Sequence, residues 1–318
     1  MTTSTLVLGI ELDGEGSHPA AWRRAGHPPA ALFDPRRLAR LAETAERAGF
    51  SFVTLDDDIS PPGPDPDVVG RIGSVERAAF LSAALSVLSV VPAVSTTYSE
   101  PFHVSSQLAS IDHVTAGRSG WVATVTEASS AASAWGRPVV SGAARLRREA
   151  ADAVEVVRAL WDSWEDDAVV RDVDLAGENY SVKGPAIVPR PPQGQLVVLA
   201  EAGLLPDHLV DVSLIAAPDL ARLRTAAAAS QTARTFAEIE VALDTPGLSA
   251  AERIADLGRH GEWTDRGRLR YAGAAAGLVK LLSELGLPLP GQTFRTVLGL
   301  PRPLSRYRAP DPLPGASR

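Results

Sequence analysis

The feature that most constrains this chain is the regular alternation of short apolar runs with helix-like segments. The apolar run TLVLGIEL (residues 5–12) is followed by residues 34–49, which place Asp34 at an N-cap, Pro35 at the first helical position and Gly49 at the end. Because the apolar runs are nearly continuous, they indicate strands of a parallel sheet that helices cover. The alternation predicts further strands at 50–58, 89–97, 119–126, 196–203, 212–217 and 236–243, and further helices at about 75–88, 102–115, 144–164, 218–234 and 250–261.

A chain of 318 residues with this alternation fits an eight-stranded (β/α)8 TIM barrel better than a doubly wound open sheet. The long insert at 165–195 contains turn residues and short alternating runs, which predict a small hairpin before the fifth strand. We expect one domain over residues 1–305 and a disordered tail over residues 306–318. In such a barrel, the polar residues that directly follow the strands are the candidates for a site.

Composition and charge exclude several classes of function. The net charge is −7 and no run of five or more basic residues occurs, so a nucleic-acid surface is not expected. The chain contains no cysteine, which removes disulfides, thiolate metal sites and thiol nucleophiles. No apolar stretch reaches about 18 residues and the N-terminus has no basic region, so we expect no membrane span, no signal peptide and a cytoplasmic location.

The sequence shows no recognisable catalytic or metal-binding motif. The six histidines show no H-E-x-x-H spacing, and no G-x-S-x-G elbow is present. Asp56, Asp57 and Asp58 could bind a hard cation, but their spacing does not fit an EF-hand, and a solvated acidic loop explains them better. We therefore predict no metal and assign no catalytic side chain. A barrel without a strong side-chain catalyst often leaves the reaction to a bound organic cofactor.

The segment DGEGSHPAAWRR (residues 13–24) follows the first predicted strand. Gly14 and Gly16 suggest a dinucleotide-binding loop, but Pro19 stands where that loop needs its third glycine. We instead predict a mobile loop over the barrel mouth. This loop would bring three side chains near a substrate: His18, Trp22 and Arg23.

Five segments resemble, in order along the chain, the bacterial-luciferase-like flavin-dependent monooxygenases, and in particular the branch with nitrilotriacetate and dibenzothiophene-sulfone monooxygenases. They are HPAAWRR (18–24), EPFHVSSQLASIDHVTAGRSGW (100–121), VVRALWDSWEDDA (156–168), YSVKGPAIVPRPPQGQLVVLAEAG (180–203) and TFRTVLGLPRPLSRY (293–307). Chance agreement of five separated segments in the same order is improbable. The chain is therefore identified as a shortened and divergent member of this superfamily.

The resemblance implies a barrel that binds reduced FMN as a diffusible substrate, which a separate NAD(P)H:flavin reductase supplies. Oxygen reacts with the flavin, and a small organic molecule is oxidised. A dry barrel mouth would suit this chemistry because no protein nucleophile is required. The family also implies a homodimer, and the deazaflavin F420, which some relatives use, is the less favoured cofactor.

The resemblance also implies which residues contact the cofactor. Asp57 matches the acidic end of the second strand, and Thr96 or Thr97 matches the polar end of the third. WVATVT (121–126) matches the motif of the fourth strand, which usually reads Trp-Asn-x-Val-Thr-Ser, and the motif after the fifth strand usually reads Gln-Ala-Gly-x-Ser. The cofactor-binding residues expected on these two motifs are Val122, Thr124, Thr126, Ala202 and Gly203.

Three departures from the family pattern weaken the expected binding of FMN. Val122 replaces the asparagine that hydrogen-bonds the flavin, whereas Thr126 keeps the hydroxyl of the family's serine. Glu201 and Leu205 replace the glutamine and serine of the phosphate site, and Glu201 would repel a nearby phosphate. A deletion near the C-terminus leaves either GRLRYAGA (267–274) as the eighth strand or a barrel without one that closes imperfectly.

These departures support an alternative function. The alternative is a non-catalytic or cofactor-deficient paralogue that keeps the barrel as a scaffold or as the partner subunit of an active homologue. A retained phosphate-binding group at the mouth, such as Arg23 or Arg137, would favour the enzyme instead.

Overall fold

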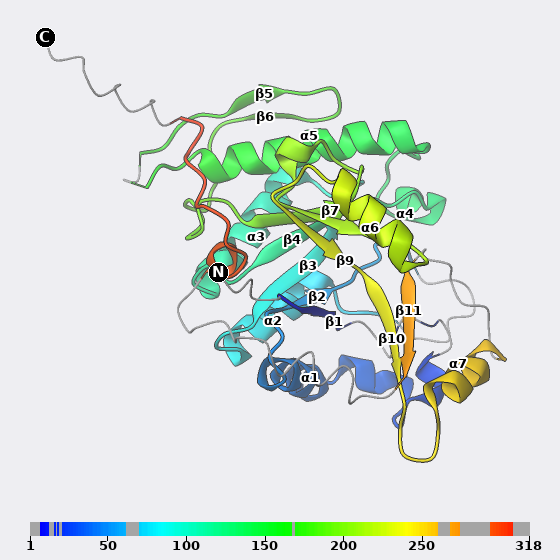
Figure 1. The fold of residues 1–318 in the computed structure, drawn as a ribbon. Helices are drawn as coiled ribbons and strands as arrows, with labels where there is room; N and C mark the ends of the chain where they lie inside the picture. The colour runs from blue at the N-terminus through cyan, green and yellow to red at the C-terminus, as the bar shows by residue number, and fades with distance from the viewer. Residues whose placement is uncertain are drawn as a thin grey trace, which may run out of the picture.

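The centre of the fold is a parallel sheet of seven strands, in a computed structural model that describes residues 7–12, 16, 18, 21–61, 70–166, 169–259, 268–273 and 293–307. The strands follow one another across the sheet in the order in which they occur along the chain. The sheet curls around an apolar interior (Figure 1). The predicted parallel sheet is thereby confirmed. Its strands are β1 (Gly9–Glu11), β2 (Phe52–Leu55), β3 (Ser89–Ser95), β4 (Gly120–Thr124), β7 (Val197–Glu201), β8 (Val212–Ile215) and β9 (Arg234–Ala237).

Helices cover the outer face of this sheet, as predicted. Ala42, Leu81 and Ile111, from three different helices, pack on Val53 and Val90 of the strands in one buried cluster. The short helix α4 was not predicted, because its sequence SSAASA shows no apolar stripe. The helices are α1 (Pro35–Arg47), α2 (Ser74–Ala84), α3 (Pro101–Val114), α4 (Ser129–Ala134), α5 (Ala143–Asp162), α6 (Leu220–Ala229), α7 (Ala250–Gly258) and α9 (Phe294–Val297), with 3-10 turns η1 (Ala21–Arg24), η2 (Pro29–Phe33) and η3 (Asp207–Leu209).

Local hydrogen bonds set the helix starts that the sequence indicates. The side chain of Asp34 accepts from Arg36 N at 2.9 Å, and the side chain of Glu100 accepts from His103 N at 2.8 Å. Each of these acidic caps is followed by proline in the first turn, which has no N–H group to satisfy there. The predicted start of the first helix at Asp34 is therefore confirmed.

Successive residues of β4 point to opposite faces of the sheet. Trp121 points outward and packs edge-on against Trp161 of α5, with ring centroids 6.4 Å apart. Val122 points inward and joins the interior cluster that includes Leu199 of β7 and Phe236 of β9. The even-numbered residues of β4, such as Val122 and Thr124, therefore face the interior of the curled sheet, where a bound ligand would lie.

The predicted hairpin before the fifth strand of the sheet is confirmed. β5 (Asp174–Ala176) and β6 (Ser181–Lys183) pair in antiparallel fashion and lie on the outside of α5 (Figure 1). Trp164, just after α5, donates through Nε1 to Ala186 O at 2.8 Å, which fastens the segment after the hairpin to the helix.

The described residues do not form a closed eight-stranded barrel. The predicted strand at 236–243 is interrupted at Glu238, so that β9 stays in the main sheet while β10 (Ile239–Leu243) pairs in parallel with β11 (Leu269–Gly273). GRLRYAGA thus contains a strand, but this strand pairs with β10 in a separate sheet. Arg268 lies 2.9 Å from Glu238 after β9 and 3.7 Å from Glu11 of β1, so ion pairs rather than a ladder of backbone hydrogen bonds link the two edges.

Residues 293–307, called the C-terminal segment below, cross the N-terminal ends of the strands (Figure 1). Phe294 is fully buried, and its ring centroid lies 5.4 Å from that of Phe52. Phe294 N donates to Gly117 O at 2.7 Å. Gly117 has a φ of +86°, and a Cβ there would lie 2.8 Å from Thr293, so the turn before β4 requires glycine. Of the predicted tail, Arg306 bonds to Glu155 at 3.0 Å, and residues 308–318 lie outside the described residues.

Candidate active site

The C-terminal ends of β3 and β4 meet at a set of hydroxyl side chains. Thr126 donates through Oγ1 to Ser95 Oγ at 3.0 Å, and Thr126 N donates to Thr97 Oγ1 at 3.2 Å. Thr96 donates through Oγ1 to the carbonyl oxygen of Thr124 at 2.9 Å. Thr96 and Thr97 are buried because these bonds hold them between the two strand ends. The structure therefore brings four of the predicted cofactor-binding residues together: Thr96, Thr97, Thr124 and Thr126.

The inner face of the sheet at this end forms an apolar floor. Val122, Leu214 and Phe236 pack on the interior cluster but remain partly exposed, whereas Leu199 is fully buried. Thr124 lies two residues beyond Val122 and therefore on the same face. Within the described part of the chain, the Thr124 hydroxyl has no hydrogen-bond partner, so it can bond to a ligand. We call this floor with the ends of β3, β4 and β7 the mouth.

Asp57 follows β2, and backbone N–H groups bind both of its carboxylate oxygens. Oδ2 accepts from Ser74 N at 2.7 Å at the start of α2, and Oδ1 accepts from Asp58 N at 2.9 Å. These bonds give Asp57 a structural role, because negative charge is favourable at a helix N-terminus. Its contact with a cofactor stays a prediction. Among the described residues, no three His, Asp or Glu side chains converge so as to hold a metal ion.

The end of β7 carries the predicted residues Ala202 and Gly203 directly after Glu201. Glu201 is exposed and, by alternation along the strand, lies on the same face as Leu199. Ala202 N donates to Leu214 O at 2.9 Å, and Gly203 adopts a φ of +81° that turns the chain away from the sheet. The carboxylate of Glu201 is therefore the charged group that β7 presents at the mouth.

The connection from β7 to β8 contains no α-helix. Leu205 packs into the outer cluster with Trp161 and is 5% exposed. Pro206 follows it, and η3 has only three residues. The side chain that replaces the family's serine is thus buried in the core on the other side of the strand from the mouth.

The segment before α1 contains the predicted substrate-side residues. His18 is buried and Trp22 of η1 is partly buried, whereas the side chain of Arg23 lies outside the described residues. Arg24 donates through Nη2 to Asp256 of α7 at 2.9 Å, which ties η1 to α7. The approach of His18, Trp22 and Arg23 to a ligand stays a prediction.

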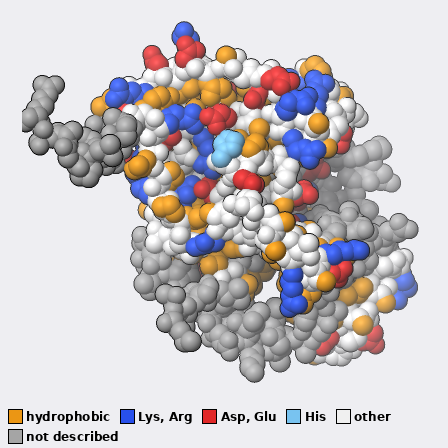
Figure 2. Space-filling model, turned by 45° about the horizontal axis from the view of Figure 1, so that its top comes forward, with side chains coloured by type: hydrophobic (Ala, Val, Ile, Leu, Met, Phe, Trp, Pro, Cys, Tyr) orange, Lys and Arg blue, Asp and Glu red, His pale blue; other side chains and the backbone are white. Residues whose placement is uncertain are grey.

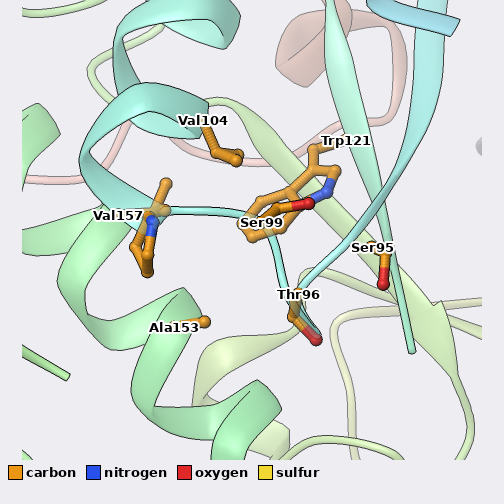
Figure 3. Close-up of a pocket in the computed structure, with 8 residues that line it drawn as sticks. Ser95, Thr96, Ser99, Val104, Trp121, Ala153 and Val157 are labelled. Carbon is orange, nitrogen blue, oxygen red and sulfur yellow. The ribbon is translucent and has the colours of Figure 1, made fainter. Parts of the chain in front are cut away.

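A small cavity lies between the sheet and its helices, behind the hydroxyl groups of β3. In Figure 3, Trp121 of β4 faces Val104 of α3, and Ala153 and Val157 of α5 lie opposite. The volume of about 10 Å³ has room for a single water molecule and not for an organic ligand. The lining residues are Ser95, Thr96, Ser99, Pro101, Val104, Trp121, Ala153 and Val157.

Sequence reasoning missed two polar residues beside this end of the sheet. Glu149 of α5 is only 3% exposed and accepts from the hydroxyl of Tyr180 at 3.0 Å. Burial and the neighbouring Glu149 raise the pKa of Tyr180. Arg137, considered above as a phosphate ligand, lies 4.0 Å from Glu149 and so has an anionic partner already. A glutamate within a helical pattern gives no signal that it is buried, which is why Glu149 was missed.

The surface carries charges of both signs. On the face in Figure 2, which turns the α5 side of the molecule forward, acidic and basic side chains alternate and neither dominates. None of the described helices is both long enough and apolar enough to span a membrane.

Comparisons with known proteins identify the family. A family model for luciferase-like monooxygenases matches residues 15–229. N-acetyl-S-(2-succino)cysteine monooxygenase of Bacillus subtilis (strain 168) is 36% identical over 210 residues, which cover 61% of this chain and 47% of that protein. One of the subunits of pristinamycin IIA synthase of Streptomyces pristinaespiralis is 31% identical over 291 residues, which cover 85% of this chain and 91% of that protein.

The chain spans about half the length of most of the curated relatives that it resembles. Nitrilotriacetate monooxygenase component A of Aminobacter aminovorans is 32% identical, and the match covers 48% of that protein. Among solved structures, EDTA monooxygenase from Chelativorans sp. BNC1 matches with a TM-score of 0.72 over 94% of this chain and 99% of that chain, at 21% identity. The predicted family is confirmed: the chain belongs to the luciferase-like monooxygenases, a family of flavin-dependent enzymes.

Proposed function

We propose that this chain is the oxygenase component of a flavin-dependent monooxygenase that uses reduced FMN and O2 to oxidise a small organic molecule. The supporting observation is the partly exposed floor of Val122, Leu214 and Phe236, with the hydroxyl of Thr124 at its edge. Binding sites for flat organic ligands combine an apolar surface with a few placed hydrogen-bonding groups. The relatives named as monooxygenases support the same reaction class.

The residues at the mouth fit the ring system of a flavin better than they fit its phosphate. The apolar floor suits a planar ring, and Thr124 can donate to or accept from a polar edge atom of that ring. Glu201 and the buried Leu205 do not suit a phosphate. Bound reduced flavin would supply the electrons that activate O2, while the chain would orient the ring and keep water away from it.

The names of two relatives indicate systems with more than one protein component. One is component A of nitrilotriacetate monooxygenase, and the other is a subunit of pristinamycin IIA synthase. For this chain we propose, on that basis, that a separate NAD(P)H:flavin reductase supplies the reduced FMN. F420 as the cofactor, a homodimeric state and a cytoplasmic location stay predictions.

Titration of the purified chain with FMN and with reduced FMN, followed by fluorescence, tests the proposal. We expect saturable binding with a Kd below about 1 mM. Thr124→Val should weaken binding about fivefold, because the ring loses a hydrogen bond of about 1 kcal/mol. The control is Thr225→Val on the exposed surface of α6, which should leave the Kd unchanged.

Two outcomes would contradict this function. One is the absence of binding up to millimolar flavin in either oxidation state. The other is an equal effect of Thr124→Val and Thr225→Val, which would place the bound flavin away from the mouth. The first outcome would favour the non-catalytic paralogue that acts as a scaffold or partner subunit.

A further inference from the structure

We propose that Glu201 is a specificity-determining residue that makes the mouth accept a flavin ring while it disfavours the phosphate of FMN. The inference rests on the proposed function, because it concerns the same floor. It predicts that the phosphate of FMN adds nothing to the affinity of this chain, so that FMN binds no more tightly than riboflavin, which has the same ring and no phosphate.

Glu201 lies at the C-terminal end of the sheet, where it can meet a ligand. Glu201 is the last residue of β7, lies beside Leu214 of β8 in the strand register, and is exposed. Leu199, two residues earlier, packs in the interior, so the side chain of Glu201 starts from the inner face. An exposed glutamate is ionised at neutral pH, and it repels a second anion held within a few ångströms.

The connection after β7 contains no α-helix, and two of its backbone N–H groups are already engaged. Ala202 N donates to Leu214 O at 2.9 Å and Leu204 N donates to Glu201 O at 3.0 Å, so both N–H groups already have partners. Pro206 has no N–H group. The next turn, η3, has three residues and begins with the acidic Asp207. The described connection therefore lacks the long helix N-terminus that commonly binds phosphate.

Three arginines near this end of the sheet already have partners. Arg77 donates through Nη1 to Leu12 O at 3.5 Å and through Nη2 to the carbonyl oxygen of Asp56. Arg268 pairs with Glu238 and Glu11, and Arg137 lies near the buried Glu149. A phosphate at the end of β7 would thus meet Glu201, while these three arginines stay paired with other groups.

Parallel titrations with FMN and riboflavin test this inference, with Glu201→Gln as the central variant. For the unchanged chain we expect riboflavin to bind at least as tightly as FMN. Glu201→Gln should tighten FMN about tenfold, because the repulsion between the two anions is removed, and should leave riboflavin within about twofold. Asp174→Asn is the control. It removes one negative charge from the exposed hairpin strand β5, outside the mouth, and should change the Kd of neither ligand.

Two results would overturn the inference. The first is an unchanged chain that binds FMN at least tenfold more tightly than riboflavin, since the phosphate would then be held. The second is a Glu201→Gln variant that shifts both ligands equally or neither. These results leave the proposed function intact, because a flavin is still bound. Failure of the proposed function looks different: neither ligand binds the unchanged chain or the variant, and the inference then falls with it.

Discussion

The two ends of the curled sheet are built in different ways. At the N-terminal end, the C-terminal segment bonds to residues about 100 positions earlier: Arg295 donates to Gln195 O at 2.7 Å and to Leu196 O at 3.1 Å. At the mouth, the hydrogen bonds join the ends of neighbouring strands, as between Thr126 and Ser95. The named contacts of the N-terminal end therefore join residues about 100 positions apart, and the bond between Thr126 and Ser95 at the mouth joins residues 31 positions apart.

Asp211, just before β8, lies at the centre of the charges at the N-terminal end. Its carboxylate accepts from Arg158 at 2.9 Å, from Arg295 at 3.0 Å and from Val198 N at 2.9 Å. Burial opposes the ionisation of Asp211, but the two guanidinium groups outweigh burial and lower its pKa. At the mouth, neutral hydrogen bonds join the hydroxyl residues, and among the described residues the ion pair of Arg137 with Glu149 reaches Thr96 only through the hydroxyl of Tyr180.

Stability and ligand selection are therefore separated along the strands. In barrels of this class the N-terminal end of the strands maintains the fold, while the C-terminal end carries the site. Val122 and Glu201, which depart from the family pattern, lie at the mouth, and the segment TFRTVLGLPRPLSRY, which keeps the resemblance, lies at the other end. Substitutions at the two ends should therefore have different consequences.

The largest expected effect comes from Phe294→Ala at the N-terminal end. The substitution removes a fully buried ring that contacts Phe52 and fills the space beside Gly120, so the free energy of unfolding should fall by about 3–5 kcal/mol. Urea unfolding measures the loss. Phe80→Ala, at a position 43% exposed on α2, is the matched control and should cost less than about 1 kcal/mol. Equal losses would mean that the C-terminal segment does not stabilise the sheet.

Asp211→Asn should have the next largest effect, a loss of about 3 kcal/mol at pH 7, because Arg158 and Arg295 would keep their buried charges without the carboxylate. Since the folded pKa of Asp211 is lowered, its stabilising contribution is fully present above the unfolded value of about 3.9 and is lost as pH falls further toward the folded value. Urea unfolding at neutral pH and below about pH 4 measures this dependence. If the difference in unfolding free energy between the unchanged chain and Asp211→Asn stays constant as pH falls below about 4, the ion pairs of Asp211 are not its cause.

The sequence predicted most of the fold because periodicity and caps are local signals. Asp34 and Gly49 mark the ends of the first helix, and the turn residues after 165 indicate the hairpin. The interruption at Glu238 was not predictable, because residues 236–243 read as one apolar run and only the pairing with a later segment divides them. Long-range pairing leaves no trace in a local pattern.

The candidate site was predictable in part. The family resemblance named Val122 and Thr124 together, and the structure places both on one face of β4. It could not show that the hydroxyls of Thr96 and Thr97 are engaged by the adjacent strand, because strand register decides this. Glu149 was missed for a similar reason, since helical spacing does not distinguish a solvated glutamate from one covered by a hairpin.

Val122→Asn changes the mouth, where the effect should be on ligand binding. The new amide can hydrogen-bond the flavin ring, so FMN and riboflavin should both bind about tenfold more tightly, or about 1.4 kcal/mol. Fluorescence titration measures both constants. Val114→Asn, at a position 64% exposed on α3, is the matched control and should change neither. A gain for FMN alone would show that position 122 senses the phosphate rather than the ring.

Asp57→Ala should have the smallest effect. It distinguishes a helix-capping role of Asp57 from a contact with the cofactor. If its carboxylate acts only as the cap seen at Ser74 N, the variant should lose about 1 kcal/mol of unfolding free energy and keep its flavin affinity. Asp34→Ala, which removes the cap of α1, should cost a similar amount and serves as the control. If instead flavin affinity falls tenfold while stability is unchanged, Asp57 contacts the cofactor as the family resemblance implies. The first result would show that a stabilising contact also lies at the C-terminal end of β2, so that the separation between the two ends of the sheet holds for β4 and β7 but not for β2.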